Sequence, residues 1–163
     1  MFPDDIEALA RRVIAEAAAG GVMIATAESC TGGLVAAALT QVAGSSAVVD
    51  RGFVTYSNEA KSDLVAVPVA LIATHGAVSE PVARAMAEGA VANSRAAVSV
   101  AITGIAGPGG GSADKPVGLV HFAAAGPAGV IHVEKRFGDI GREEVRLASV
   151  GVALDLLLDR VGG

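Results

Sequence analysis

The spacing of apolar residues along the chain predicts helices and strands in alternation. Between residues 4 and 19 they recur three and four positions apart, as on one face of a helix. Asp4 or Asp5 is expected to cap this helix, and Gly20 with Gly21 to end it. Further helices are predicted over residues 31–41, 58–65, 68–74, 80–93 and 141–160. Strands are predicted over residues 22–27, 47–56, 96–103, 117–125 and 130–137.

Two details refine this order of elements. The last two predicted strands are joined by "GPAG", which indicates an antiparallel hairpin, and Gly52 marks a bend in the second strand. Alternating helices and strands followed by a hairpin favour an α/β protein, a three-layer α/β/α fold with a mixed β-sheet. No internal repeat or linker divides the chain, so we expect a single domain over residues 1–163.

Composition narrows the classes of protein that the chain can be. Apolar residues make up 52% of the 163 residues but aromatic ones only 3%, so the core must be built from small aliphatic side chains. A formal charge of −5 argues against a nucleic-acid partner. One cysteine excludes an intrachain disulfide. An acidic start and the lack of a long apolar run predict no signal peptide, no membrane partner and a cytoplasmic location.

The segment "ATAESCTGG" places Ser29, Cys30 and Thr31 where a predicted strand gives way to a helix. Ligands of open α/β sheets bind at the carboxyl ends of strands, and N–H groups at a helix start can hold an anion. Gly32 and Gly33 would let a ligand approach the backbone. The segment therefore predicts a functional site, with simple helix capping as the alternative. It does not match the G-x-S-x-G elbow of hydrolases.

A serine nucleophile needs a base. The histidines are poor candidates, because His121 and His132 lie inside predicted strands and His75 lies in a turn, and their scatter also argues against zinc. Lys61, in "TYSNEAK", is the other option if it is uncharged. It would lie in the first turn of a helix capped by Asn58, where the helix dipole lowers the pKa of a lysine. A solvated surface lysine is the alternative.

A glycine-rich segment, "GIAGPGGGSADKPVG", lies between two predicted strands. It matches neither the dinucleotide fingerprint nor the P-loop. Thr103, which precedes it, would add a hydroxyl to the same site, and a flexible connection is the alternative. Consecutive N–H groups would form an anion-binding nest at Gly104, Gly107, Gly109, Gly110 and Gly111.

Two arginines mark the last predicted helix, Arg142 at its start and Arg146 one turn on. The helix dipole disfavours a cation at the start. Arg142 therefore indicates a group that binds phosphate or carboxylate, and a surface network with Glu143 and Glu144 is the alternative.

Four segments, in this order and spacing, closely resemble the C-terminal domain of the competence/damage-inducible protein CinA family. They are "TAESCTGG", "GSS…RGFVTYSNEAK", "HGAVSEPVA" and "GIAGPGGG…KPVG", and the resemblance runs from about residue 5 to residue 160. That family includes stand-alone nicotinamide-nucleotide amidases. The chain resembles this stand-alone form, because the larger N-terminal domain of many CinA proteins is absent from it.

The resemblance implies hydrolysis of nicotinamide mononucleotide to nicotinate mononucleotide and ammonia, in pyridine nucleotide salvage. It implies a small nucleotide as substrate and no metal or cofactor. Ser29 would be the nucleophile, with Lys61 and Tyr56 transferring protons and Cys30 serving as packing. Substrate-binding groups would be Thr31, Gly32, Gly33, Thr103, Gly104, Gly107 and Arg142.

The chain departs from the family pattern near its end. The family usually reads G-D-R, whereas "GDIGR" inserts Ile140 and Gly141, so both Arg142 and Arg146 stay candidates for the ligand-binding arginine. Whether Lys61 or Tyr56 is the direct base also stays open. A non-catalytic pyridine-nucleotide-binding regulatory domain and a protein-binding scaffold are the other functions considered. The sequence does not decide whether the chain forms a homo-oligomer.

Overall fold

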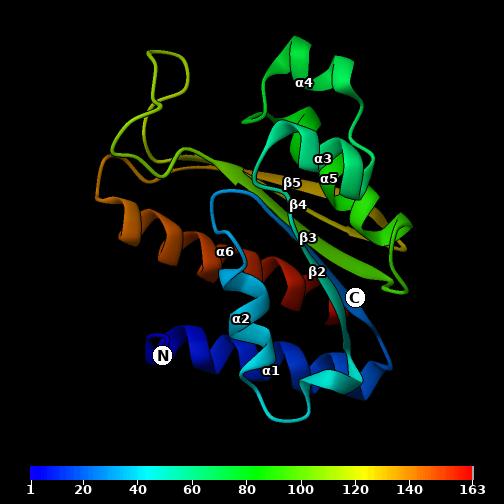
Figure 1. The fold of residues 1–163 in the computed structure, drawn as a ribbon. Coiled ribbons are helices and arrows are strands. Elements are labelled where there is room, and N and C mark those ends of the chain that lie inside the picture. The colour runs from blue at the N-terminus through cyan, green and yellow to red at the C-terminus, as the bar shows by residue number, and fades with distance from the viewer. Residues whose placement is uncertain (163) are drawn as a thin grey trace.

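The computed structural model describes residues 1–162, which form a five-stranded sheet with helices on both faces (Figure 1). The strand order is β2-β1-β3-β4-β5. β1 is parallel to β2 and β3, whereas β3, β4 and β5 are antiparallel neighbours. The strands are β1 (Ile24–Glu28), β2 (Val49–Val54), β3 (Val98–Gly104), β4 (Leu119–Gly126) and β5 (Gly129–Arg136). This confirms the predicted α/β fold with a mixed sheet, including the hairpin.

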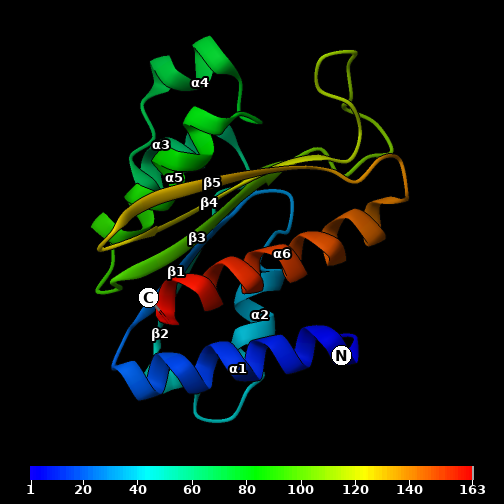
Figure 2. The same ribbon diagram turned by 180° about the vertical axis from the view of Figure 1, so that it is seen from behind.

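The helices divide between the two faces of the sheet, which gives three layers (Figure 2). One face carries α1 (Asp4–Gly20), α2 (Leu34–Thr40) and α6 (Arg142–Gly162). The other carries α3 (Asn58–Val65), α4 (Val69–His75) and α5 (Glu80–Ala92). A single 3₁₀ turn, η1 (Ser45–Ala47), precedes β2. None of the helices within residues 1–162 is long and apolar enough to cross a membrane.

The core lies in two layers, one on each side of the sheet. The layer under α5 consists largely of alanines, as the scarcity of aromatic residues led us to expect. Small side chains let α5 lie close to the sheet, where the Ser99 hydroxyl donates to the Ala87 carbonyl at 2.6 Å. α5 also touches α3 closely, since a Cβ on Gly89 would lie 1.8 Å from the Val65 carbonyl oxygen.

Three helix starts differ from the sequence expectations. The N-cap of α1 is Pro3, so Asp4 and Asp5 lie in its first turn, where the helix dipole favours acidic side chains. α3 is capped by Ser57 and not by Asn58, because the Ser57 hydroxyl accepts from the N–H of Ala60 at 3.0 Å. α2 begins at Leu34, three residues later than predicted, because a tight turn intervenes after β1.

The predicted bend at Gly52 is also wrong. The irregularity between β1 and β2 falls at Asp50, the residue passed over where the pairing moves from Ile24–Val49 to Ala25–Arg51. Gly52 is instead needed for close packing, because a Cβ there would lie 2.9 Å from the hydroxyl oxygen of Thr26.

Candidate active site

Ser29 and Lys61 meet at the carboxyl end of β1. Ser29 directly follows that strand, and Lys61 extends from α3 on the neighbouring segment. The Lys61 amine lies 3.1 Å from the Ser29 hydroxyl oxygen. Lys61 is only 1% exposed, so it is not the solvated surface lysine that the sequence left open. The hydroxyl of a serine and the amine of a buried lysine are thus in direct contact.

Backbone carbonyls surround the rest of the Lys61 amine. Its Nζ donates to the carbonyl of Thr55 at 2.9 Å and has weaker contacts with those of Tyr56 at 3.4 Å and Ser57 at 3.5 Å. Within residues 1–162 it forms no salt bridge with a carboxylate. Burial lowers the pKa of Lys61, and the neighbouring Cys30 acts in the opposite direction. The lowered pKa of Lys61 is therefore caused by desolvation and not by the helix dipole, which was the cause expected from the sequence.

This environment suits an uncharged amine. A neutral amine has two hydrogens, which the nearby carbonyls can accept, and one lone pair. The remaining neighbour of Lys61 is the Ser29 hydroxyl, whose oxygen lies within hydrogen-bond distance of Nζ. This hydroxyl accepts from a protonated amine and can donate to the lone pair of an uncharged one. The arrangement can therefore remove the proton of Ser29 without an intermediary.

Glu28 anchors the turn that carries Ser29. It is the last residue of β1 and only 1% exposed, and its carboxylate accepts from the N–H groups of Val35 at 2.9 Å and Ala36 at 3.0 Å. These groups belong to the first turn of α2, so the anion-binding end of the helix is already occupied. The expectation that this helix start would hold a ligand anion is corrected. The sequence signal for this role was an acidic residue, Glu28, directly after a largely apolar predicted strand.

The glycines after Ser29 are explained by backbone conformation. Gly32 has a φ of 57° and Gly33 a φ of 106°, values that favour glycine, and the chain turns sharply there before α2 begins. Thr31 is fully buried, and its hydroxyl oxygen has no hydrogen-bond partner among the described residues. Arg146 holds this turn from outside by donating to the carbonyls of Cys30 at 3.1 Å and Thr31 at 3.3 Å.

Arg142 and Tyr56 form a second contact beside the turn. Tyr56 is 60% exposed, and its hydroxyl accepts from Nη2 of Arg142 at 3.2 Å. Nη1 of Arg142 donates to the carbonyl of Gly107 at 2.8 Å. The start of α6, the end of the β2–α3 connection and the glycine loop are thereby linked. In this arrangement the Tyr56 hydroxyl does not lie between Ser29 and Lys61, whose direct contact leaves it no relay position.

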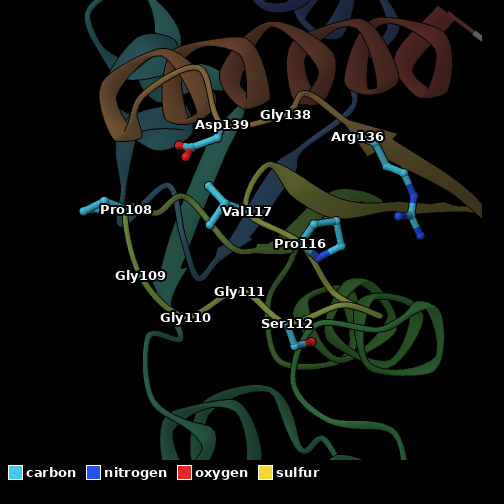
Figure 3. Close-up of a pocket in the computed structure, with 10 residues that line it drawn as sticks. All are labelled: Pro108, Gly109, Gly110, Gly111, Ser112, Pro116, Val117, Arg136, Gly138 and Asp139. Carbon is cyan, nitrogen blue, oxygen red and sulfur yellow. The ribbon is translucent and has the colours of Figure 1, made fainter.

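The glycine loop frames a pocket of about 590 Å³ (Figure 3). Gly109, Gly110 and Gly111 line it together with Arg136, the last residue of β5, and Asp139 from the segment between β5 and α6. Ser29 and Lys61 are not among its lining residues. The lining begins at Pro108, directly after Gly107, whose carbonyl accepts from Arg142.

Two other predicted site residues have structural neighbours. The Thr103 hydroxyl is buried and donates to the carbonyl of Ala77 at 2.9 Å. A Cβ on Gly104 would lie 2.7 Å from a methyl group of Val120, so this glycine is required by packing against β4. Cys30, 7% exposed, was expected to pack, and burial raises the pKa of its thiol to about 12.

The structure also pairs two histidines that the sequence argument treated as scattered. His121 on β4 and His132 on β5 stack, with Nδ1 of His121 2.9 Å from Nε2 of His132. Glu134 lies 3.8 Å from the outer nitrogen of His121, and Glu80 lies 3.6 Å from that of His132. Burial lowers the pKa of both imidazoles. No group of three or more potential metal-ligating side chains is found among residues 1–162.

The fold and this site define a class of protein: an α/β domain with a mixed sheet and a serine–lysine pair at the carboxyl end of β1. The family model for the CinA C-terminal domain matches residues 6–161. The chain therefore belongs to the CinA C-terminal domain family.

Individual relatives agree with this assignment. A CinA-like protein of Anaeromyxobacter dehalogenans (strain 2CP-C) is 53% identical over 158 residues, which cover 96% of this chain and 38% of that protein. A CinA-like protein of Synechococcus sp. (strain RCC307) is 52% identical over 157 residues, again 96% of this chain and 38% of the relative. The chain thus spans well under half the length of these curated relatives.

Solved structures of full-length similarity also exist. The competence/damage inducible protein CihA from Agrobacterium tumefaciens is 60% identical with a TM-score of 0.96, and the match covers 98% of this chain and 97% of that one. A competence-damaged protein (CinA) superfamily protein from Klebsiella pneumoniae 700603 is 36% identical with a TM-score of 0.90, covering 96% and 97% of the two chains. The observed mixed sheet is therefore the fold of the CinA superfamily.

Proposed function

We propose that this protein is an amidohydrolase that converts nicotinamide mononucleotide to nicotinate mononucleotide and ammonia. The observation that carries the proposal is the 3.1 Å contact between the Lys61 amine and the Ser29 hydroxyl. Burial favours the uncharged lysine, and an uncharged lysine is the base that a serine nucleophile needs. The resemblance of the sequence motifs to the nicotinamide-nucleotide amidases supplies the substrate.

In the first half of the reaction Ser29 is acylated. Its Oγ forms a bond to the carboxamide carbon while its proton passes to Nζ of Lys61. The tetrahedral intermediate then collapses as the C–N bond breaks. The Lys61 ammonium gives its proton to the departing nitrogen, so ammonia leaves and the nicotinate group stays on Ser29 as an ester.

In the second half water replaces the serine. Lys61, again uncharged, takes a proton from the attacking water, whose oxygen bonds to the ester carbon. The bond between that carbon and Oγ breaks, and the proton held by Lys61 returns to Ser29. The sum of both halves is amide plus water giving carboxylic acid plus ammonia, which ionise to carboxylate and ammonium, with no metal ion and no cofactor consumed.

The phosphate of the mononucleotide needs positive partners. Arg142 is a cation at the glycine loop, where its guanidinium donates to the Gly107 carbonyl and the Tyr56 hydroxyl. We assign Arg142 to the phosphate and Tyr56 to holding that guanidinium in place. N–H groups of the glycine loop, around the pocket of about 590 Å³, add further donors for an anion.

The test is ammonia release from nicotinamide, its riboside and its mononucleotide, followed for the wild type and Ser29→Ala. The expected result is turnover of the mononucleotide that falls to background in Ser29→Ala, with the mononucleotide still bound. Ser94→Ala, just beyond the end of α5, is the matched control and should keep wild-type turnover. Binding of the mononucleotide without ammonia release would make the protein a nucleotide-binding regulatory domain and overturn the proposal.

A further inference from the structure

Three consecutive carbonyls where α4 ends each accept from a different side chain. Nζ of Lys115 donates to the carbonyl of His75, the last residue of α4, at 2.6 Å. The hydroxyls of Ser79 and Thr103 donate to the next two carbonyls at 2.8 Å and 2.9 Å. Thr103 belongs to β3, so this segment is fixed to the sheet and offers Lys115 a firm point of attachment.

The backbone beside His75 leaves room for the Lys115 amine. A Cβ on Gly76 would lie 2.7 Å from Nζ of Lys115, and its φ of 78° also favours glycine. The last carbonyls of a helix have no partner within that helix, and a lysine side chain is one of the groups that can bind them. The donor, the acceptor and the space between them therefore fit one another.

The glycine loop, residues 104–118, is closed both at its neck and near its tip. At the neck its two limbs pack together so closely that a Cβ on Gly107 has no room. Near the tip the N–H of Ser112 donates to the Lys115 carbonyl at 2.8 Å, and the N–H of Lys115 donates to the Ser112 hydroxyl at 3.1 Å. Because the limbs are joined, a contact that fixes Lys115 also orients the three glycines that line the pocket.

Two cations tie this loop to helices on opposite faces of the sheet. Arg142 on α6 donates to the Gly107 carbonyl at 2.8 Å, and Lys115 donates to the end of α4. The loop follows β3, a parallel neighbour of β1, and so starts at the same edge as Ser29. It projects beyond that edge between α4 and the start of α6 (Figure 1, Figure 2). Within the described chain, residues 108–114 have no hydrogen bond outside the loop, so Lys115 provides the polar attachment of its outer half.

We propose that Lys115 is a positioning residue that holds the glycine loop in place to receive the phosphate of the mononucleotide. The inference rests on the proposed function, in which this loop supplies N–H donors to that phosphate. Lys115 acts through the loop backbone and does not touch the phosphate, because its amine is bonded to the His75 carbonyl. A loop already held in its binding conformation does not have to be ordered when the ligand arrives, and the lower entropy cost gives tighter binding.

The first test compares substrates with and without the phosphate. Lys115→Ala should raise KM for the mononucleotide roughly three- to tenfold and leave kcat unchanged, a modest effect because the contact is exposed to solvent. Hydrolysis of nicotinamide riboside, which lacks the phosphate, should keep its kcat/KM. Lys135→Ala is the matched control, since it removes an exposed lysine from β5, outside the loop, and should behave as the wild type.

Two further variants test the contact itself. Lys115→Arg retains a donor for the His75 carbonyl, so its KM should lie close to that of the wild type. Gly76→Ala places a methyl group where the Lys115 amine lies, and it should raise KM by about the same factor as Lys115→Ala. Because both substitutions break one contact, the double variant should show no further rise. An unchanged kcat/KM for the riboside shows in each case that the variant is folded.

Hydrogen exchange and calorimetry measure the loop without turnover. In Lys115→Ala the amides of residues 109–114 should exchange faster than in the wild type. In the Ser29→Ala background, Lys115→Ala should weaken mononucleotide binding by the same factor by which it raises KM. A wild-type KM in Lys115→Ala, or an equal loss for the mononucleotide and the riboside, would overturn the positioning role alone.

Two results would separate this role from the proposed function. A protein that binds the mononucleotide, more weakly in Lys115→Ala, but releases no ammonia would refute the amidase and leave the role of Lys115 standing. A protein that does not bind the mononucleotide at all would refute both.

Discussion

Lys61 and His121 are buried and His132 is half-buried, and the lysine differs from the two histidines in its partners. Burial lowers the pKa of the lysine and of both imidazoles. Lys61 is surrounded by carbonyls and one hydroxyl. The imidazoles bond to each other, and a carboxylate stands at each outer nitrogen.

The difference decides which group can act as a base. In the histidine pair one ring nitrogen donates to the other, so the facing lone pair is already in use. The lone pair of an uncharged Lys61 faces a hydroxyl that can give up its proton. Both regions therefore contain groups with a lowered pKa. They differ in what the nitrogen lone pair faces: a hydroxyl at Lys61, and the other ring in the histidine pair.

Among substitutions in these two regions, replacing Lys61 should lower turnover the most. Lys61→Met keeps the apolar length of the side chain and removes the base, so ammonia release should fall by at least the roughly 10²- to 10⁴-fold that general base catalysis contributes. Lys61→Arg, which stays charged at ordinary pH, should be similarly inactive. An active Lys61→Arg enzyme would exclude the base role, because arginine cannot accept the serine proton.

The acid limb of the pH profile should follow Lys61 and not the histidines. Burial places the pKa of Lys61 below its ordinary 10.5, and the proposed mechanism requires the uncharged amine. As pH rises, kcat/KM should rise about tenfold per unit and level off above that lowered pKa. The measurement is kcat/KM across pH for the wild type and His132→Gln. A limb that moves in His132→Gln would assign it to the histidine pair.

The histidine pair should contribute to stability and leave turnover unchanged. His132→Gln leaves a buried nitrogen of His121 without its partner, which costs about 1–3 kcal/mol of unfolding free energy in urea titrations. Because the folded imidazoles have pKa values below the ordinary 6.5, the unfolded chain takes up protons first as pH falls. Stability of the wild type should therefore drop below about pH 6.5, and less steeply in the variant. A loss of kcat with unchanged stability would contradict the structural role.

Cys30 should show the smallest effect, although it lies next to Ser29. Burial raises the pKa of its thiol to about 12, so it stays protonated at neutral pH and is a poor nucleophile. Cys30→Ala should keep kcat within about threefold and cost on the order of 1 kcal/mol of stability. Rapid labelling of the native protein by iodoacetamide at pH 7.5 would show that the thiol is more reactive than this environment allows.

The order of elements followed from apolar periodicity, because the helices and the three inner strands bury apolar side chains against the core. Exact starts were less predictable. The sequence offered Asn58 as a cap for α3, but the neighbouring Ser57 makes the bond, and both residue types suit that position. The late start of α2 depends on the turn of Gly32 and Gly33, which ordinary helix signals do not describe.

Contacts across the fold explain what the sequence left open in the site. Lys61 and Ser29 are 32 residues apart, and their meeting depends on the parallel pairing of β1 with β2, which places both strand ends together. The histidine pair was within reach of sequence reasoning. Once "GPAG" defines the hairpin, residues 121 and 132 become diagonal neighbours on adjacent strands. The contacts of Arg142 and Arg146 could not be predicted from the sequence, because one helical turn decides which backbone carbonyl each can reach.

Because α5 contacts α3, Gly89 influences the position of the Lys61 side chain without touching it. A Cβ at this position would overlap the carbonyl oxygen of Val65, in the last turn of the helix that carries Lys61. A larger residue would force α3 and α5 apart, and an outward shift of α3 would move the Lys61 amine away from the Ser29 hydroxyl. The spacing of the serine–lysine pair is thus set partly by the absence of one methyl group on a different helix, a dependence that a search for residues near Ser29 would overlook.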